Sequence, residues 1–147
     1  MILRVLWPGK TKQPYYREAI DDYASRIRNL IRFEIVETRE ESRTDKQRKL
    51  RLRKESAALA AHRKAPVSVF LDSSGKQISS EEFALWLEKM QSDIDFILGG
   101  PEGTLVPDNA IKFSFGKMTL PHELARVVLL EQIYRALTIL KKIPYHK

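Results

Sequence analysis

Cysteine is absent from this chain of 147 residues. Its absence excludes disulfide bonds, thiolate metal sites and cysteine nucleophiles, and it is typical of proteins that fold in a reducing compartment. The histidines His62, His122 and His146 are far apart in the sequence. Because a structural metal site needs several such ligands close together, we expect no metal.

The chain also lacks long apolar runs and familiar nucleotide-binding signatures. No stretch approaches the roughly 18 apolar residues that a membrane-spanning helix needs, and the apolar start at residues 1–7 is too short for a signal peptide. We therefore expect a cytoplasmic protein with no membrane partner. No G-x-G-x-x-G follows the first strand and no G-x-x-x-x-G-K-[ST] occurs, which argues against a dinucleotide site and a P-loop. RNP-type aromatic motifs and zinc-finger spacings are missing as well.

Positive charge is what the chain has in excess. Its 26 Lys and Arg residues against 19 Asp and Glu give a net charge of +7, and residues 26–54 alone carry eleven basic and five acidic residues. A basic segment of this kind can bind nucleic-acid phosphates by releasing their counterions, although most charge runs are solvated helix faces. We interpret the segment as a nucleic-acid contact.

Length and periodicity predict one α/β domain over residues 1–147. Apolar runs and amphipathic stretches alternate, with strands expected at 2–7, 33–36, 67–71, 95–98 and 111–115 and helices at 15–30, 45–63 and 122–140. A further helix is expected after Ser79, with Phe83, Leu87 and Met90 along one face. Ser79 and Glu82 have the spacing of a capping box before the third helix, and the basic second helix has only a thin apolar side. Strands that alternate with helices favour a parallel sheet covered on both faces.

Two of these strands end at loops rich in glycine and proline. The fourth stops at Gly-Gly-Pro-Glu-Gly (99–103), and the fifth stops at residues 116–122. In open α/β sheets ligands bind outside the carboxyl ends of the strands, and glycine lets the backbone approach a ligand closely. The pattern predicts a ligand site at this edge; the alternative is two tight turns that only reverse the chain.

The last predicted helix is apolar around most of its circumference, between Leu124 and Leu140. A helix that packs on a sheet needs an apolar stripe of only about 100°. The rest of that surface must be buried on a second side, and another copy of the chain is the simplest cover. We expect a homodimer, with cover by the chain's own loops as the alternative.

The chain resembles the RlmH-type SPOUT methyltransferases in its length, its opening strand and five motifs. The motifs are GGPEG at 99–103, KMTLPH at 117–122, RV at 126–127, EQIYRA at 131–136 and PYHK at 144–147. The resemblance implies methylation of N3 of a pseudouridine, pseudouridine 1915, in large-subunit ribosomal RNA of the ribosome. It also implies a SPOUT-type α/β domain with a C-terminal deep trefoil knot that forms the dimer interface, although chains rarely thread loops.

The resemblance further implies S-adenosylmethionine (SAM) as the methyl donor, held by main-chain groups of the two glycine-bearing loops. Apolar side chains would sandwich the adenine while loop amides and carbonyls contact its edge. The residues that the resemblance places against SAM are Leu71, Gly99, Gly100, Phe115, Gly116, Lys117, Met118, Thr119 and Leu120. Gly116 stands where related chains often carry Ser, a change that main-chain contacts tolerate.

Methyl transfer to a ring nitrogen requires alignment of the reacting atoms and a group that accepts the N3 proton or stabilises the anion. The candidates are His122, Arg126, Tyr145 and His146, with Glu102 and Lys147 nearby. Each has a structural alternative: His122 could cap the last helix, Arg126 could pair with Glu123, and the tail could fray. The resemblance makes the tail a substrate contact at a site that both subunits complete.

Two functions from different classes follow. The first is a SAM-dependent ribosomal RNA methyltransferase; the second is a basic α/β protein that binds RNA or ribosomes without catalysis. SAM binding that a bulky residue at Gly99 or Gly100 abolishes would favour the first. We also expect that replacing Arg48, Lys49 and Arg51 by Glu weakens ribosome binding but spares SAM affinity.

Overall fold

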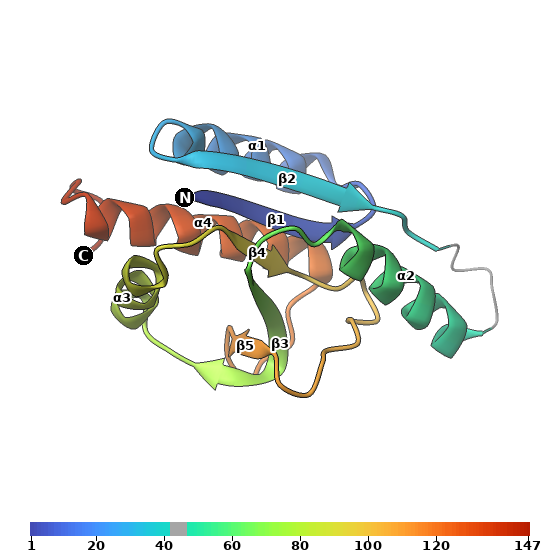
Figure 1. Cartoon of the computed structure of the whole chain (residues 1–147). Coiled ribbons are helices and arrows are strands. Elements are labelled where there is room, and N and C mark those ends of the chain that lie inside the picture. Colours follow the sequence, from blue (N-terminus) through green and yellow to red (C-terminus); the bar gives the residue numbers. More distant parts are fainter. Residues whose placement is uncertain (42–46) are drawn as a thin grey trace.

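The computed structural model of the chain describes residues 1–41 and 47–147 (Figure 1). Five parallel strands form one sheet in the order β2-β1-β4-β3-β5. The strands are β1 (Ile2–Pro8), β2 (Arg32–Thr38), β3 (Val67–Gln77), β4 (Ile94–Ile97) and β5 (Ile111–Ser114). The helices are α1 (Pro14–Arg28), α2 (Arg48–His62), α3 (Ser80–Met90) and α4 (His122–Leu140). The predicted parallel α/β class is confirmed.

Strand β3 is longer than the sequence pattern predicts. It was expected to end at Leu71, but it continues to Gln77 and its register on β5 shifts between Leu71 and Lys76. The Asp72 carboxylate accepts hydrogen bonds from the amide and the hydroxyl of Ser74, which closes a local turn before pairing resumes. The start of the basic helix, expected near Asp45, lies outside the described residues; α2 begins at Arg48.

The two faces of the sheet are covered differently. Alternate residues of a strand point to opposite faces, so Leu3, Val5 and Trp7 of β1 join a large core with α1, α3 and α4, whereas Leu6 faces α2. Among residues 1–41 and 47–147, the cluster beneath α2 contains four buried apolar residues, Leu6, Leu59, Phe70 and Ile97. The thin apolar side predicted for the basic helix therefore matches a small core.

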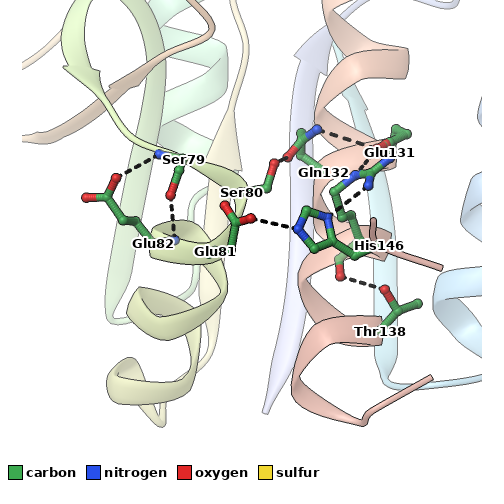
Figure 2. Close-up of polar contacts among 9 residues, drawn as sticks. Ser79, Ser80, Glu81, Glu82, Glu131, Gln132, Thr138 and His146 are labelled. Carbon is green, nitrogen blue, oxygen red and sulfur yellow. Dashed lines mark hydrogen bonds and ion pairs between the residues drawn. The ribbon is translucent and has the colours of Figure 1, made fainter. Parts of the chain in front are cut away.

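Local signals in the sequence place the helix starts. Ser79 Oγ accepts the Glu82 amide at 3.0 Å, and Glu82 Oε1 accepts the Ser79 amide at 3.1 Å, so the capping box of α3 is formed (Figure 2). Pro14 opens α1, where its missing N–H removes no helical hydrogen bond. Helices α1, α3 and α4 thus begin close to their predicted positions.

Helix α4 lies against the sheet and packs on both α1 and α3. Cover by the chain itself, the alternative given for its apolar circumference, therefore accounts for much of that surface; the homodimer stays a prediction. Several large apolar side chains outside this core are exposed, among them Leu85 at 55%, Phe115 at 38% and Met118 at 89%. Within residues 1–41 and 47–147, no helix has the length and apolar character to cross a membrane.

Candidate active site

A cavity of about 220 Å³ lies beyond the carboxyl ends of β4 and β5, beside residues 71–73 of β3. Parallel strands bring these ends to one edge, which is where α/β sheets bind ligands. The cavity is lined by Leu71, Asp72, Ser73, Leu98, Ser114, Phe115, Gly116, Met118, Thr119, Leu120 and Ala125. Six of these residues are apolar, and four carry polar side chains: Asp72, Ser73, Ser114 and Thr119.

Most residues predicted to contact SAM are brought together here. Six of the nine line the cavity: Leu71, Phe115, Gly116, Met118, Thr119 and Leu120. Lys117, Gly99 and Gly100 do not line it: Lys117 is exposed, and the two glycines follow Leu98, which does line the cavity. Asp72, Ser73 and Ser114 were not singled out from the sequence, although the end of each predicted strand is the signal that could have found them.

The segment after β5 is shaped by Ser114 and Gly116. Ser114 Oγ accepts the Gly116 amide at 3.1 Å and donates to the Gly116 carbonyl at 3.0 Å. Gly116 has φ +129°, a conformation that residues with a Cβ rarely adopt. The turn leaves Phe115 and Met118 exposed beside the cavity. Exposed apolar side chains grouped at a cavity indicate that a ligand or a partner covers them.

The glycine turn after β4 is closed by the backbone. The Gly103 amide donates to the Gly100 carbonyl at 2.9 Å, and Gly103 has φ +82°. A Cβ on Gly99 would lie 2.2 Å from the carbonyl carbon of Gly103. Since real Cβ contacts are never this short, any side chain at Gly99 must displace the turn.

Arg126 is buried beneath the segment that follows β1. Its side chain is 1% exposed, and its guanidinium donates to the carbonyls of Pro8 (2.6 Å) and Gly9 (3.2 Å) and to Thr11 Oγ1 (3.0 Å). Burial lowers the pKa of Arg126 to about 10. In this placement Arg126 holds the backbone of residues 8–11, and it does not line the cavity.

His122 and Glu123 occupy the first turn of α4, directly after the cavity segment. His122 is the first helical residue and Pro121 is the N-cap, so His122 does not take the capping position. Glu123 accepts the amides of Lys12 (2.9 Å) and Gln13 (3.1 Å). Burial acts to raise the pKa of Glu123, but these amides outweigh it and hold the pKa below its ordinary value. His122 Nε2 lies 3.9 Å from Glu123 Oε2.

The C-terminal tail is folded back on the helices. His146 Nδ1 lies 3.0 Å from Arg135 Nη1, and His146 Nε2 lies 2.7 Å from Glu81 Oε1, so this ring bridges α4 and α3 (Figure 2). The Tyr145 ring packs on Tyr134, 4.8 Å between centroids. Burial, with a hydrogen bond to Tyr23, raises the pKa of Tyr145 to about 12. The tail is thus held in place, and neither Tyr145 nor His146 lines the cavity.

A solved structure and several curated proteins are similar to this chain. The structure is described as a probable methylase family protein from Haemophilus influenzae Rd KW20; it superposes with a TM-score of 0.54 at 9% identity, over 99% of this chain and 70% of that one. At this identity the likeness shows the fold alone.

The sequence comparisons show which family the chain belongs to. The family described as "Predicted SPOUT methyltransferase" matches residues 1–146. The ribosomal RNA large subunit methyltransferases H of Limosilactobacillus fermentum and Clostridium acetobutylicum are 37% and 35% identical to this chain, each over 159 aligned positions that cover both proteins completely. The chain therefore belongs to the SPOUT methyltransferases, in the family of the ribosomal RNA large subunit methyltransferases H.

Proposed function

We propose that this methyltransferase modifies N3 of a pseudouridine in large-subunit ribosomal RNA, pseudouridine 1915, with SAM as the methyl donor. One observation carries the proposal: in a chain of this family, six residues expected to contact SAM surround one cavity at the carboxyl edge of the sheet. The names of the relatives support ribosomal RNA as the substrate, and the net charge of +7 suits a polyanion.

The cavity has the groups that SAM requires. Leu71, Phe115 and Met118 offer apolar surfaces to an adenine ring, and the backbone of residues 114–120 offers amides and carbonyls to its edge. Asp72 and Ser73 place hydrogen-bonding oxygens at the same cavity, where they would suit ribose hydroxyls. When bound, SAM supplies a methyl group on a positively charged sulfur.

We assign acceptance of the N3 proton to His122. His122 does not line the cavity itself, but it lies two residues after Leu120, which does, and its side chain is 27% exposed. A neutral imidazole can accept a proton in this pH range, and the nearby Glu123 carboxylate stabilises the cation that forms. Replacing His122 by Asn should lower kcat about 100-fold and leave SAM affinity within about twofold. Unchanged kcat would exclude this role.

We propose that the active form is a homodimer with the C-terminal segment threaded as a deep trefoil knot. Within one chain Tyr145 and His146 contact α3 and α4 and are not at the SAM cavity, so their predicted role at the substrate needs a second copy. A second apolar cavity of about 240 Å³ shares Leu71, Ser114 and Phe115 with the first, which supports a partner surface there. Sedimentation equilibrium tests the dimer.

A calorimetric titration with SAM tests the proposal most directly. We expect micromolar binding to the wild type and loss of binding in Gly99→Val, because a side chain at Gly99 meets the Gly103 backbone. Lys89→Ala, an exposed position on α3, is the control and should bind normally. Ribosome binding without any heat from SAM would favour the non-catalytic RNA-binding protein instead.

The substrate is tested by mass spectrometry of ribosomal RNA. Ribosomes from a strain that lacks the enzyme should gain one methyl group on the target pseudouridine when incubated with SAM and the wild-type protein. Gly99→Val should leave the RNA unmodified. Methylation at another nucleotide would keep the enzyme class and overturn the proposed substrate.

A further inference from the structure

The cations of α2 are divided between two environments. Arg48, Lys49, Arg53 and Lys54 are exposed. Arg51 is different, because its side chain is only 13% exposed and its guanidinium pairs with the Glu102 carboxylate. Glu102 belongs to the glycine turn 99–103, so Arg51 joins the basic helix to a segment 51 residues away.

A second contact joins α2 to the chain just beyond this turn. Ser56 Oγ accepts the Leu105 amide at 2.9 Å and lies 3.2 Å from Thr104 Oγ1. Between these two contacts the Glu55 carboxylate faces Gly100, where an added Cβ would lie 3.2 Å from Oε1. One side of α2 therefore follows residues 100–105 over more than one helical turn.

The helix itself is fixed to the sheet, so it can hold the turn in place. Leu59 is 2% exposed in the small core. At its carboxyl end the His62 carbonyl accepts Arg4 Nη2 at 2.8 Å, and Asp95 Oδ2 accepts the Lys64 and Ala65 amides at 2.7 and 3.0 Å. These contacts to β1 and β4 make α2 a support that reaches from the sheet to the glycine turn.

We propose that Arg51 and Ser56 are positioning residues that hold residues 99–105 in the SAM-binding conformation, while the exposed cations of the same helix contact RNA phosphates. The inference rests on the proposed function, because it takes SAM as the ligand of the turn. A turn with three glycines samples many backbone conformations when it is released. The apparent affinity for SAM is then lowered in proportion to the fraction of molecules that keep the binding conformation.

The sequence expectation for Arg48, Lys49 and Arg51 as one group therefore mixes two roles. Alone, Arg51→Met should weaken SAM binding about fivefold to tenfold, the range expected when a largely buried ion pair is lost. Arg53→Met, on the same helix but exposed, should bind SAM within about twofold of the wild type. It should weaken ribosome binding instead. The number of phosphate contacts inferred from the salt dependence of that binding should fall by about one.

Kinetics separate positioning from a general loss of structure. Arg51→Met should raise KM for SAM while kcat at saturating SAM and ribosomes stays within about twofold of the wild type. Arg51→Lys, which keeps the charge, should recover most of the affinity, and Glu102→Gln should reproduce the loss. The double variant Arg51→Met with Glu102→Gln should be no weaker than either single one. Full additivity, or equal SAM affinity in Arg51→Met and Arg53→Met, overturns the proposal.

Hydrogen exchange of the ligand-free protein keeps the two proposals distinguishable. The amides of Gly103 and Leu105, which donate to Gly100 and to Ser56, should exchange about fivefold to tenfold faster in Arg51→Met than in Arg53→Met. A wild type that binds no SAM would overturn the proposed function, and these amides would then decide whether Arg51 holds the turn. Unchanged exchange beside normal SAM binding would leave the function standing and refute the positioning role.

Discussion

In the part of the chain that the structure describes, three helices cover one face of the sheet and one helix, α2, covers the other (Figure 1). Among the described residues the core beneath α1, α3 and α4 holds 20 buried apolar residues, and the core beneath α2 holds four. Because apolar burial is roughly proportional to area, most of the hydrophobic stabilisation lies on the first face. The second face must be held in another way.

Polar contacts replace apolar packing on the α2 face. Arg4, Glu55 and Asp95 are each less than 9% exposed. Each forms a hydrogen bond with a backbone group of another segment. Contacts of this kind are directional, so they fix where α2 lies even though little surface is buried. The comparison explains how one helix can be strongly basic and still serve as a support.

The largest predicted effect tests the apolar side of this comparison. Ile133 on α4 is fully buried, and Ile133→Ala should lower the free energy of unfolding by about 4 kcal/mol. Leu59→Ala, in the small core, should cost about 2 kcal/mol. The cost is smaller because fewer side chains surround Leu59, so the space left by the substitution can collapse more easily. Urea unfolding measures both. Equal costs would show that the two cores do not differ in the way proposed.

The polar side is tested at Asp95, which has no exposed surface. Asp95→Asn removes the negative charge that faces Arg4 Nε at 3.6 Å and weakens the bonds to the Lys64 and Ala65 amides. We expect a cost of about 2 kcal/mol. Glu34 also lies 3.6 Å from Arg4 Nε, but its side chain is 57% exposed, so Glu34→Gln should cost less than about 0.5 kcal/mol. Similar costs for the two variants would contradict the view that buried polar contacts hold α2 on the sheet.

Sequence patterns predict what is local and miss what joins distant segments. The strands and the capping box at Ser79 follow from periodicity and local spacing, and the ligand edge follows from loops at strand ends. The individual cavity residues between Phe115 and Leu120 were predicted from the family resemblance, and all of them except Lys117 line the cavity. Arg51 and Arg53 are indistinguishable in the sequence, because only the fold brings Glu102 to one of them. The same holds for Arg126, whose partners lie 115 to 118 residues away.

Apart from the control variants, the smallest predicted change in the free energy of unfolding concerns a polar contact of α4, on the face of the sheet that carries the larger core. Glu123 accepts two amides of the segment before α1, and its folded-state pKa lies below its ordinary value of 4.5. Its stabilisation should therefore be present above that value and lost as the pH falls through the folded pKa. At pH 7 Glu123→Gln should cost about 1 kcal/mol.

Unfolding free energies measured at several acidic pH values check this sign. The difference between the wild type and Glu123→Gln should shrink as the pH falls below 4.5, since the protonated carboxyl then resembles the amide. Glu18→Gln, an exposed change on α1, should stay close to the wild type throughout. If the difference instead grew on acidification, the two amides would not hold the Glu123 carboxylate. Polar anchoring would then be confined to the α2 face, which sharpens the contrast between the faces.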